Sequence, residues 1–525
     1  MEGNSKKIVV TIIIFLGLLL GVSYAVKGAA DTFALFTLRA AMEIKHDGKV
    51  TLDKPIYNFA LTEHHQGLEF LLATILIITG IPGLELIYLP IGSVLYSFGI
   101  ALLLFSIIHS EKIGTLKLLM AVVAIIAVTF SGGGYVQPFY TIFHQSWGFY
   151  LMFVYIYVLL SENAKKTRGR LMLILIFIAT GLVYYTVNNW LLFFNIAIFF
   201  FKLINRFKPE KTKVKFLELH VVSENFLLFS VIIWWLFNTI TSQNLLIRVL
   251  KQPNQILSIF NNLYILFKRE HLPPSVVLYP QLVGIINTLI IMLVNLPILI
   301  YITIAMISFF KPNRNLVKLS SKNLNYITLL YLVIITSDVV GYGLLGGSYV
   351  FVRHFYLHGT FISSTILLNT INKINFKRYL QKAFFTWTFL LLILSIIRYP
   401  YLTNTVADQD VKLQQNSLRI LNSLYQGEII CSYKTIAILT FSLNDASAHK
   451  FRTFLQIFDS EESDYNICDV RIGEFVIVST KDWNSFVMVQ EWKVLPPVKI
   501  AYEQLENYSN LISSSGIFSI WVRCR

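Results

Sequence analysis

The sequence predicts a mainly α-helical, polytopic membrane protein with a small α/β domain at its C-terminus. Hydrophobic residues make up 55% of the 525 residues and charged residues only 14%, which is unlike a soluble globular protein. Apolar runs of about 20 residues recur, and such a run is enough to cross a hydrocarbon core roughly 30 Å thick. Lysine and arginine gather in short clusters between apolar runs. These three observations predict a bundle of transmembrane helices.

The basic clusters predict the orientation of the spans, because basic residues near span ends are retained on the cytoplasmic side. The clusters lie at residues 6–7, 112–117, 165–170, 202–215, 311–322 and 373–382. They predict a cytoplasmic N-terminus and an extracytoplasmic C-terminal segment. The formal net charge of +15 belongs largely to these loops. No basic face interleaved with aromatic residues accompanies it, so nucleic acid is not an expected partner.

About 11 spans follow from this alternation of apolar runs and basic clusters. They are residues 8–26, 85–108, 118–130, 147–160, 171–185, 190–201, 221–240, 282–310, 327–340, 354–371 and 384–397. The first span follows Lys6 and Lys7, and no small-residue cleavage site stands out after it. We therefore interpret it as a retained signal anchor. Residues 186–189 are expected to form a tight outer turn.

Residues 68–81 are apolar, but we interpret them as a short interfacial or re-entrant helix on the outer side. A full crossing would move every later basic cluster to the outer face and reverse the charge asymmetry. At about 14 residues the segment is also short for a crossing. The helix is expected to end at the sequence Gly80-Ile81-Pro82-Gly83.

The chain divides into a transmembrane domain, residues 1–399, and an extracytoplasmic α/β domain, residues 400–525. The first outer loop of the transmembrane domain covers residues 27–84. The C-terminal domain contains the three cysteines Cys431, Cys468 and Cys524. Their wide spacing gives no metal-binding motif and allows one disulfide, whose pairing stays open.

Charged residues return after residue 399, and short alternating runs replace the long apolar ones. Residues 474–478 and 517–522 have the alternation of half-buried strands, and residues 413–424 are expected to form a helix. This pattern predicts the small α/β domain.

No nucleotide-binding, serine-hydrolase or zinc-protease motif occurs along the chain. An ATP-driven pump or a zincin is therefore not expected. What remains is a set of polar residues at the outer membrane border. Ionisable groups there are costly unless they face a water-filled cavity, so they are candidates for function.

Asp31 follows the first span closely and opens an amphipathic stretch at residues 32–44. The apolar side of that stretch carries Leu35, Leu38, Met42 and Ile44. An aspartate at the N-cap of a helix satisfies backbone amide donors without any catalytic role. A capping carboxylate at the edge of a cavity is also held rigidly, so both roles are compatible with Asp31.

Glu63, His64 and His65 precede the apolar residues 68–81. They are either polar residues of an interfacial turn or part of the same pocket as Asp31. Two adjacent histidines with a glutamate could bind a divalent metal ion. Adjacent side chains diverge, however, so a metal site is not favoured.

This arrangement resembles the GT-C superfamily, the polytopic glycosyltransferases that use polyprenyl-phosphate-linked sugars, and the archaeal members look most similar. The matching residues are Asp31, Leu38-Arg39, Asp47-Gly48, residues 65–72, Thr79-Gly80-Ile81-Pro82 and residues 510–521. The resemblance implies that Asp31 is the general base that takes the proton of the acceptor. Glu63, in the pocket expected around Asp31, is the second candidate catalytic residue.

The resemblance also implies a leaving group that is a lipid phosphate, whose developing negative charge needs cationic donors. Arg353, His354 and His358 fit this need, because the outer loop of residues 341–353 re-enters the membrane there. Arg353 is equally compatible with a snorkelling anchor at the headgroup level. The remaining candidate pocket residues are His64, His65, His144, Tyr185 and Asn188, although aromatic residues there also suit an interface belt.

Oligosaccharyltransferases are similar in architecture but carry an acidic metal-ligand motif in their second outer loop. Residues 131–138 contain no carboxylate, so metal-free transfer of one sugar without a cofactor is favoured. In the long outer loop of residues 241–280, basic residues suit either a solvated interfacial helix or a lipid-phosphate contact.

The expected function is therefore an integral-membrane hexosyltransferase of the cell envelope. It would transfer a sugar from a polyprenyl-phosphate-linked donor in the membrane to an extracytoplasmic glycan, protein or lipid. The alternatives are a transporter or flippase of lipid-linked glycans, and a non-catalytic membrane scaffold. The absence of two similar halves, and acids that cluster at one face, disfavour a transporter.

Overall fold

The computed structural model describes the chain in segments. These are residues 32–48, 67–81, 91–108, 144–161, 166–207, 223–240, 289–303, 322–344, 378–398, 428–431, 450–453, 475–479, 509–514 and 518–523, with Thr11, Leu86, Leu89, Ala164, Ile286, Ile362, Ser363 and Ile366. The segments are mostly helical, which confirms the prediction of a mainly α protein.

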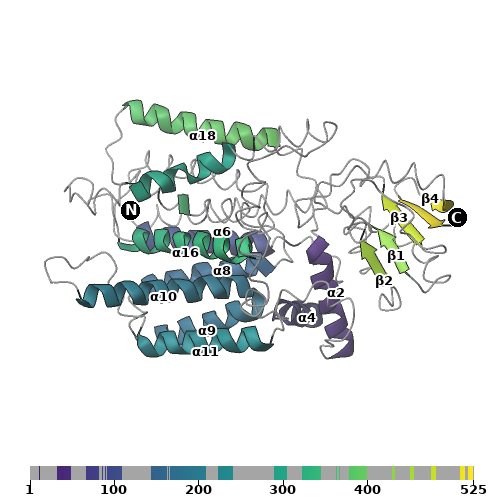
Figure 1. Cartoon of the computed structure of the whole chain (residues 1–525), viewed down its shortest axis with the longest axis horizontal. Helices are drawn as coiled ribbons and strands as arrows, with labels where there is room; N and C mark the ends of the chain where they lie inside the picture. Colours follow the sequence, from purple (N-terminus) through teal and green to yellow (C-terminus); the bar gives the residue numbers. More distant parts are fainter. Residues whose placement is uncertain are drawn as a thin grey trace.

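The helices are labelled as in Figure 1. They are α2 (Thr32–Asp47), α4 (Gly67–Thr79), α6 (Ile91–Ile108), α8 (His144–Leu160), α9 (Thr167–Val183), α10 (Tyr185–Phe207), α11 (Glu224–Ile240), α16 (Lys322–Leu344) and α18 (Arg378–Arg398), together with the apolar helix Leu289–Thr303. The axes of helices α8, α9, α10, α11, α16 and α18 are nearly aligned with one another, whereas α2 lies across one end of them (Figure 1). We call the aligned helices, together with α6 and the helix Leu289–Thr303, the bundle.

Most of the packing in the bundle joins helices that are neighbours in the chain, and α16 packs on the distant helix α10. Helix α8 packs against α6 and α9, and α10 packs against α9, α11 and α16. The bundle helices overlap the spans predicted from residue 85 onwards wherever the chain is described. The predicted span 118–130, the span 8–26 apart from Thr11, and most of 354–371 lie outside the described residues.

Within the described residues, one helical segment, Thr186–Leu203, is both long enough and apolar enough to cross a membrane. The other apolar helical segments are shorter, at 10–17 residues. Half of the residues of Thr186–Leu203 are buried inside the bundle, and a core helix of a soluble protein can have the same length and composition.

The turn between α9 and α10 corrects the predicted turn at residues 186–189. The chain reverses at Tyr184 alone, which is extended (φ −152°, ψ 95°) and donates its backbone N–H to Thr180 O at 2.8 Å. Residues 186–189 instead form part of the first helical turns of α10. The prediction was wrong because polar residues such as Asn188 favour a loop in the sequence, whereas in the structure the Asn188 amide hydrogen-bonds to α9.

Two glycines let elements of the bundle approach closely. A Cβ on Gly99 of α6 would overlap the ring of Phe153 on α8. A Cβ on Gly148 of α8 would lie 2.7 Å from the Cβ of Tyr184. Side chains larger than hydrogen at either position would force the helices apart.

The described strands of the C-terminal segment form one five-stranded sheet of order β2-β1-β3-β5-β4. The strands are β1 (Glu428–Cys431), β2 (Lys450–Thr453), β3 (Phe475–Ser479), β4 (Ser509–Ser514) and β5 (Phe518–Arg523). Strand β1 pairs in parallel with β2 and β3, and β5 pairs antiparallel with β3 and β4. β3 and β5 occupy the two runs expected as strands, and residues 413–424 lie outside the described residues. The sheet lies beyond α2, at the same end of the molecule (Figure 1).

Candidate functional site

Helices α2 and α4 pack on each other at one end of the bundle, and we call this pair the border unit. α2 contributes a buried apolar side that includes Leu38, Ala41 and Ile44. α4 contributes Leu68, Leu72, Ala73 and Leu76. The Lys45 ammonium group also donates a hydrogen bond to the backbone oxygen of Leu76 at 3.3 Å. The amphipathic stretch predicted at residues 32–44 is thus confirmed as a helix, and it continues to Asp47.

Both helices of the border unit end at a glycine in the left-handed region. Gly48 has φ +66° and donates its N–H to Ile44 O at 2.9 Å, and Gly80 has φ +66° and donates to Leu76 O at 3.2 Å. Glycine adopts this conformation without a Cβ penalty, so it ends helices readily. The predicted end of the short helix at Gly80 is confirmed.

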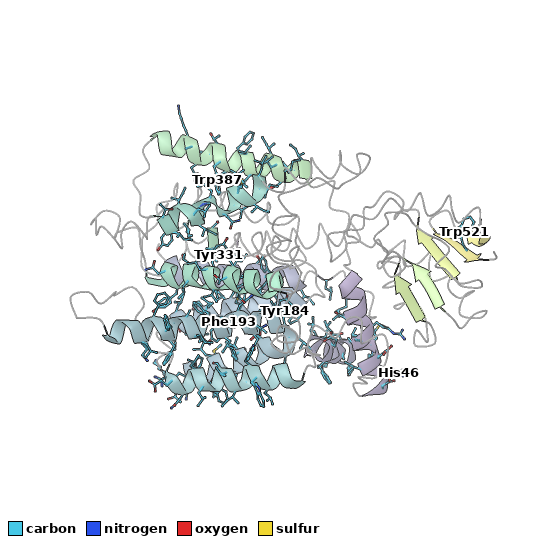
Figure 2. The ribbon with its side chains drawn as sticks, in the orientation of Figure 1. His46, Tyr184, Phe193, Tyr331, Trp387 and Trp521 are labelled. Atoms are coloured by element: carbon cyan, nitrogen blue, oxygen red, sulfur yellow. The ribbon has the colours of Figure 1, made fainter. Side chains whose placement is uncertain are left out.

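The border unit is attached to the bundle where α4 begins. A Cβ on Gly67 would lie only 2.6 Å from the backbone oxygen of Leu182, near the C-terminus of α9. The contact is between backbones, so neither side can yield by a side-chain rotation. Figure 2 shows Tyr184 at the end of the bundle that faces the border unit, and His46 at the far end of α2.

A cluster of buried aromatic rings supports this end of the bundle. Phe149 stacks on Trp190 with ring centroids 5.9 Å apart and an angle of 13° between the planes. The same ring meets Tyr184 edge-on at 6.4 Å and 88°, and lies 6.2 Å from Tyr96. Because the four residues come from α6, α8, α10 and the α9–α10 turn, the cluster fixes these elements to one another.

Basic residues lie at the opposite end of the bundle. Lys166, Arg168 and Arg170 are exposed at the start of α9, and Lys202 is exposed near the end of α10. α9 has 17 residues, so its two ends lie roughly 25 Å apart at 1.5 Å per residue. Gly67 contacts the C-terminal end of α9, and the border unit therefore lies across the bundle from these basic residues.

The border unit carries its own charged groups. Arg39 Nε and Glu43 Oε1 form an ion pair at 2.9 Å on successive turns of α2. His46 Nδ1 lies 2.8 Å from Asp47 Oδ1 at the exposed end of that helix. Glu69 of α4 is only 1% exposed, on the side of α4 that is buried. The polar surface of the unit is thus on α2.

The predicted site residues are described only in part. Those outside the described residues are Asp31, Glu63, His64, His65, Arg353, His354 and His358. Asp31 immediately precedes the first residue of α2, and residues 63–65 precede Gly67, the first residue of α4, by two positions or more. His144 and Tyr185 are the first residues of α8 and α10. Through the contact of Gly148 with Tyr184, both helices begin at the end of the bundle that carries the border unit.

Asn188, predicted as a pocket residue, makes contacts of a structural kind. It is buried, and its Nδ2 donates to Phe177 O at 2.8 Å and to Thr180 Oγ1 at 3.3 Å. Both acceptors belong to α9, so the amide holds the α9–α10 turn closed. Next to it, Asn189 Oδ1 accepts a hydrogen bond from Trp234 Nε1 of α11 at 2.6 Å.

Sequence reasoning did not single out Glu69 or the aromatic cluster. The cluster joins residues from position 96 to position 190, and no local spacing connects them. Glu69 is the one charged residue in an otherwise apolar helix, and this is the signal in the sequence that distinguishes it. Across the described segments, no three histidine, cysteine, aspartate or glutamate side chains gather as a metal site requires.

No protein-family model matches the chain, and no curated protein matches it in sequence.

Proposed function

We propose that this protein is an integral-membrane glycosyltransferase of GT-C type. It transfers a sugar from a polyprenyl-phosphate-linked donor to an extracytoplasmic glycan, protein or lipid, and Asp31 is the general base. The C-terminal residues 400–525 form an extracytoplasmic α/β domain, and the bundle has about 11 spans. The sequence motifs described above support this proposal, together with three features of the structure.

The first feature is the surface of the bundle. From Leu171 to the end of α9, and from Leu228 to Leu236 in α11, every exposed side chain is apolar. The exposed residues of α11 include Ile232 and Trp235. A helix that is apolar on its buried and its exposed sides suits a membrane span and not a water-facing surface.

The second feature is the way in which exposed hydroxyl groups are satisfied. The hydroxyls of Thr74, Thr79, Thr303 and Thr386 each donate to the backbone oxygen four residues earlier in their own helix. In hydrocarbon no water is available, so each polar group must find its partner within the protein. The exposed faces therefore present methyl groups and satisfied hydroxyls, as a lipid environment requires.

The third feature carries the enzymatic proposal. α2 starts one residue after Asp31 and crosses the end of the bundle opposite the basic residues of α9 and α10. Basic residues mark the cytoplasmic side, so this arrangement favours an outer position for α2. A carboxylate that leads into a helix fixed by α4 is suited to act as a base on an acceptor that arrives from outside.

The proposed reaction is a single displacement. The acceptor hydroxyl oxygen attacks the anomeric carbon, the bond from that carbon to the phosphate oxygen breaks, and Asp31 takes the hydroxyl proton. The polyprenyl phosphate leaves with the bonding electron pair, and its negative charge is stabilised by Arg353, His354 and His358. The products are the glycosylated acceptor and the lipid phosphate.

The test compares Asp31→Asn with Glu224→Gln in a strain that lacks the native protein. Glu224 is exposed at the start of α11, outside the proposed site, and the two changes remove the same charge. Surface glycans are analysed by mass spectrometry, and membrane abundance by immunoblot. The proposal predicts glycans that lack one sugar with Asp31→Asn and complete glycans with Glu224→Gln, at equal abundance. Complete glycans with both variants contradict it and favour a transporter or a scaffold.

A further inference from the structure

The polarity of α4 is inverted relative to a helix on a water-facing surface. Its buried side contains the carboxylate of Glu69, which is 1% exposed. Its exposed side contains Ile77 and Ile78, which are 61% and 78% exposed, and also Phe70 and Leu71. A surface helix in water normally turns its charged residues outward and its isoleucines inward.

The exposed side of α4 is one continuous face. Positions 70, 71, 74, 77 and 78 recur with helical spacing, and Thr74 is the only polar residue among them. The Thr74 hydroxyl donates to Phe70 O at 2.8 Å, and the Thr79 hydroxyl at the end of the helix donates to Ile75 O at 2.7 Å. The face thus offers no hydroxyl proton to water.

This face begins about one helical turn after a contact with the apolar exterior of the bundle. α4 begins against Leu182 of α9, and the Leu182 side chain is itself exposed. On the other side of α4 lies α2, whose exposed residues at its C-terminal end are Lys45, His46 and Asp47. In the border unit, the exposed face of α4 is therefore apolar, and the exposed residues at the C-terminal end of α2 are polar.

We infer that the face formed by Phe70, Leu71, Ile77 and Ile78 is inserted among the acyl chains of the outer leaflet. α4 is then a shallow membrane anchor and not a span, and it holds α2 at the level of the lipid headgroups. The occupant of the face is bilayer lipid, because an apolar surface with internally satisfied hydroxyls suits hydrocarbon. The inference rests on the proposed function only in requiring that the bundle is embedded in a membrane.

The experiment measures the depth of a fluorescent label at Ile78 in the full-length protein, reconstituted in phosphatidylcholine nanodiscs. Cys431, Cys468 and Cys524 are first replaced by serine. Single cysteines are then introduced as Ile78→Cys, His46→Cys on the polar face of α2, and Ile232→Cys in the middle of α11. Each is labelled with bimane and quenched by iodide in water or by nitroxides at shallow and deep positions of the lipid chains.

The inference predicts that the shallow lipid nitroxide quenches the Ile78 label strongly and that iodide does not. The Ile232 label should respond most to the deep nitroxide, and the His46 label to iodide. Quenching of the Ile78 label by iodide as strong as that at His46 overturns the inference, and so does protection from every quencher, which indicates cover by protein. If the Ile232 label is quenched by iodide alone, the bundle is not embedded and the proposed function fails separately.

Discussion

The hydroxyl of Tyr331 on α16 donates a hydrogen bond to Asn295 Oδ1 on the helix Leu289–Thr303, at 2.5 Å. Six residues away on each helix the pair is reversed, and Tyr301 donates to Asn325 Oδ1 at 2.6 Å. The two pairs have matching offsets in opposite chain directions, so they fix one register between antiparallel helices. All four residues are buried. Buried polar pairs of this kind link helices inside an apolar bundle.

Replacement of Tyr331 by Phe is expected to weaken the contact between these two helices. In membrane proteins such interhelical hydrogen bonds contribute on average about 0.6 kcal/mol, with a maximum near 1.7 kcal/mol. A double-mutant cycle of Tyr331→Phe with Asn295→Ala, followed by unfolding in detergent, measures this coupling. Strictly additive losses of stability show that the pair contributes no interaction energy.

Replacement of Gly99 by Ala is expected to destabilise the bundle by about 1–3 kcal/mol, the cost typical of overpacking. The new methyl group overlaps the ring of Phe153, which is fully buried, so the ring must shift within the packed interior. Thermal unfolding in detergent gives the effect. The second change Phe153→Leu should restore part of the stability in the Gly99→Ala background, although it lowers stability in the wild type.

Replacement of Gly67 by Ala is expected to loosen the border unit from the bundle. The added Cβ meets the backbone oxygen of Leu182, which cannot move aside. Limited proteolysis with trypsin at Lys45, and loss of sugar transfer, report on the detachment. Thr74→Ala is the matched control on the same helix, because Thr74 is exposed and its hydroxyl bonds only within α4. Equal protease resistance in both variants argues against the contact.

Replacement of Asn188 by Ala separates a structural role from a place in the substrate pocket. The variant loses the hydrogen bonds to Phe177 O and Thr180 Oγ1, a loss of about 1 kcal/mol in stability. Sugar transfer per folded molecule should stay unchanged. A normal unfolding temperature with reduced sugar transfer would instead show that Asn188 acts in the substrate pocket. Asn225→Ala, at an exposed position of α11, serves as the neutral control.

Much of the helical fold could be predicted, because long apolar runs and end signals are local. Gly80 ends α4 where the sequence predicted, since a left-handed residue after an apolar run is a local feature. The start of α10 was missed for the opposite reason. Thr186, Asn188 and Asn189 are polar and favour a loop in the sequence, whereas the distant contact of Asn188 with α9 stabilises the first turns of α10.

Features that depend on distant contacts could not be predicted. Tyr301 and Asn325 are 24 residues apart, and Tyr331 and Asn295 are 36 apart, so no periodicity pairs them. The inverted face of α4 is also hidden in the sequence, because nearly all of its residues are apolar and only packing decides which are exposed. Asp31, Glu63 and Arg353 stay predictions from sequence, because they lie outside the described residues.

The proposed function requires that the border unit and the basic end of the bundle lie on opposite sides of a membrane. A membrane-impermeant thiol reagent tests this in intact cells, with single cysteines at His46→Cys and Arg168→Cys after the three native cysteines are replaced by serine. The predicted result is labelling of His46→Cys in intact cells, and of Arg168→Cys only after the membrane is permeabilised. Labelling of Arg168→Cys from outside, or equal labelling of both positions in intact cells, contradicts the proposed placement on opposite sides of the membrane.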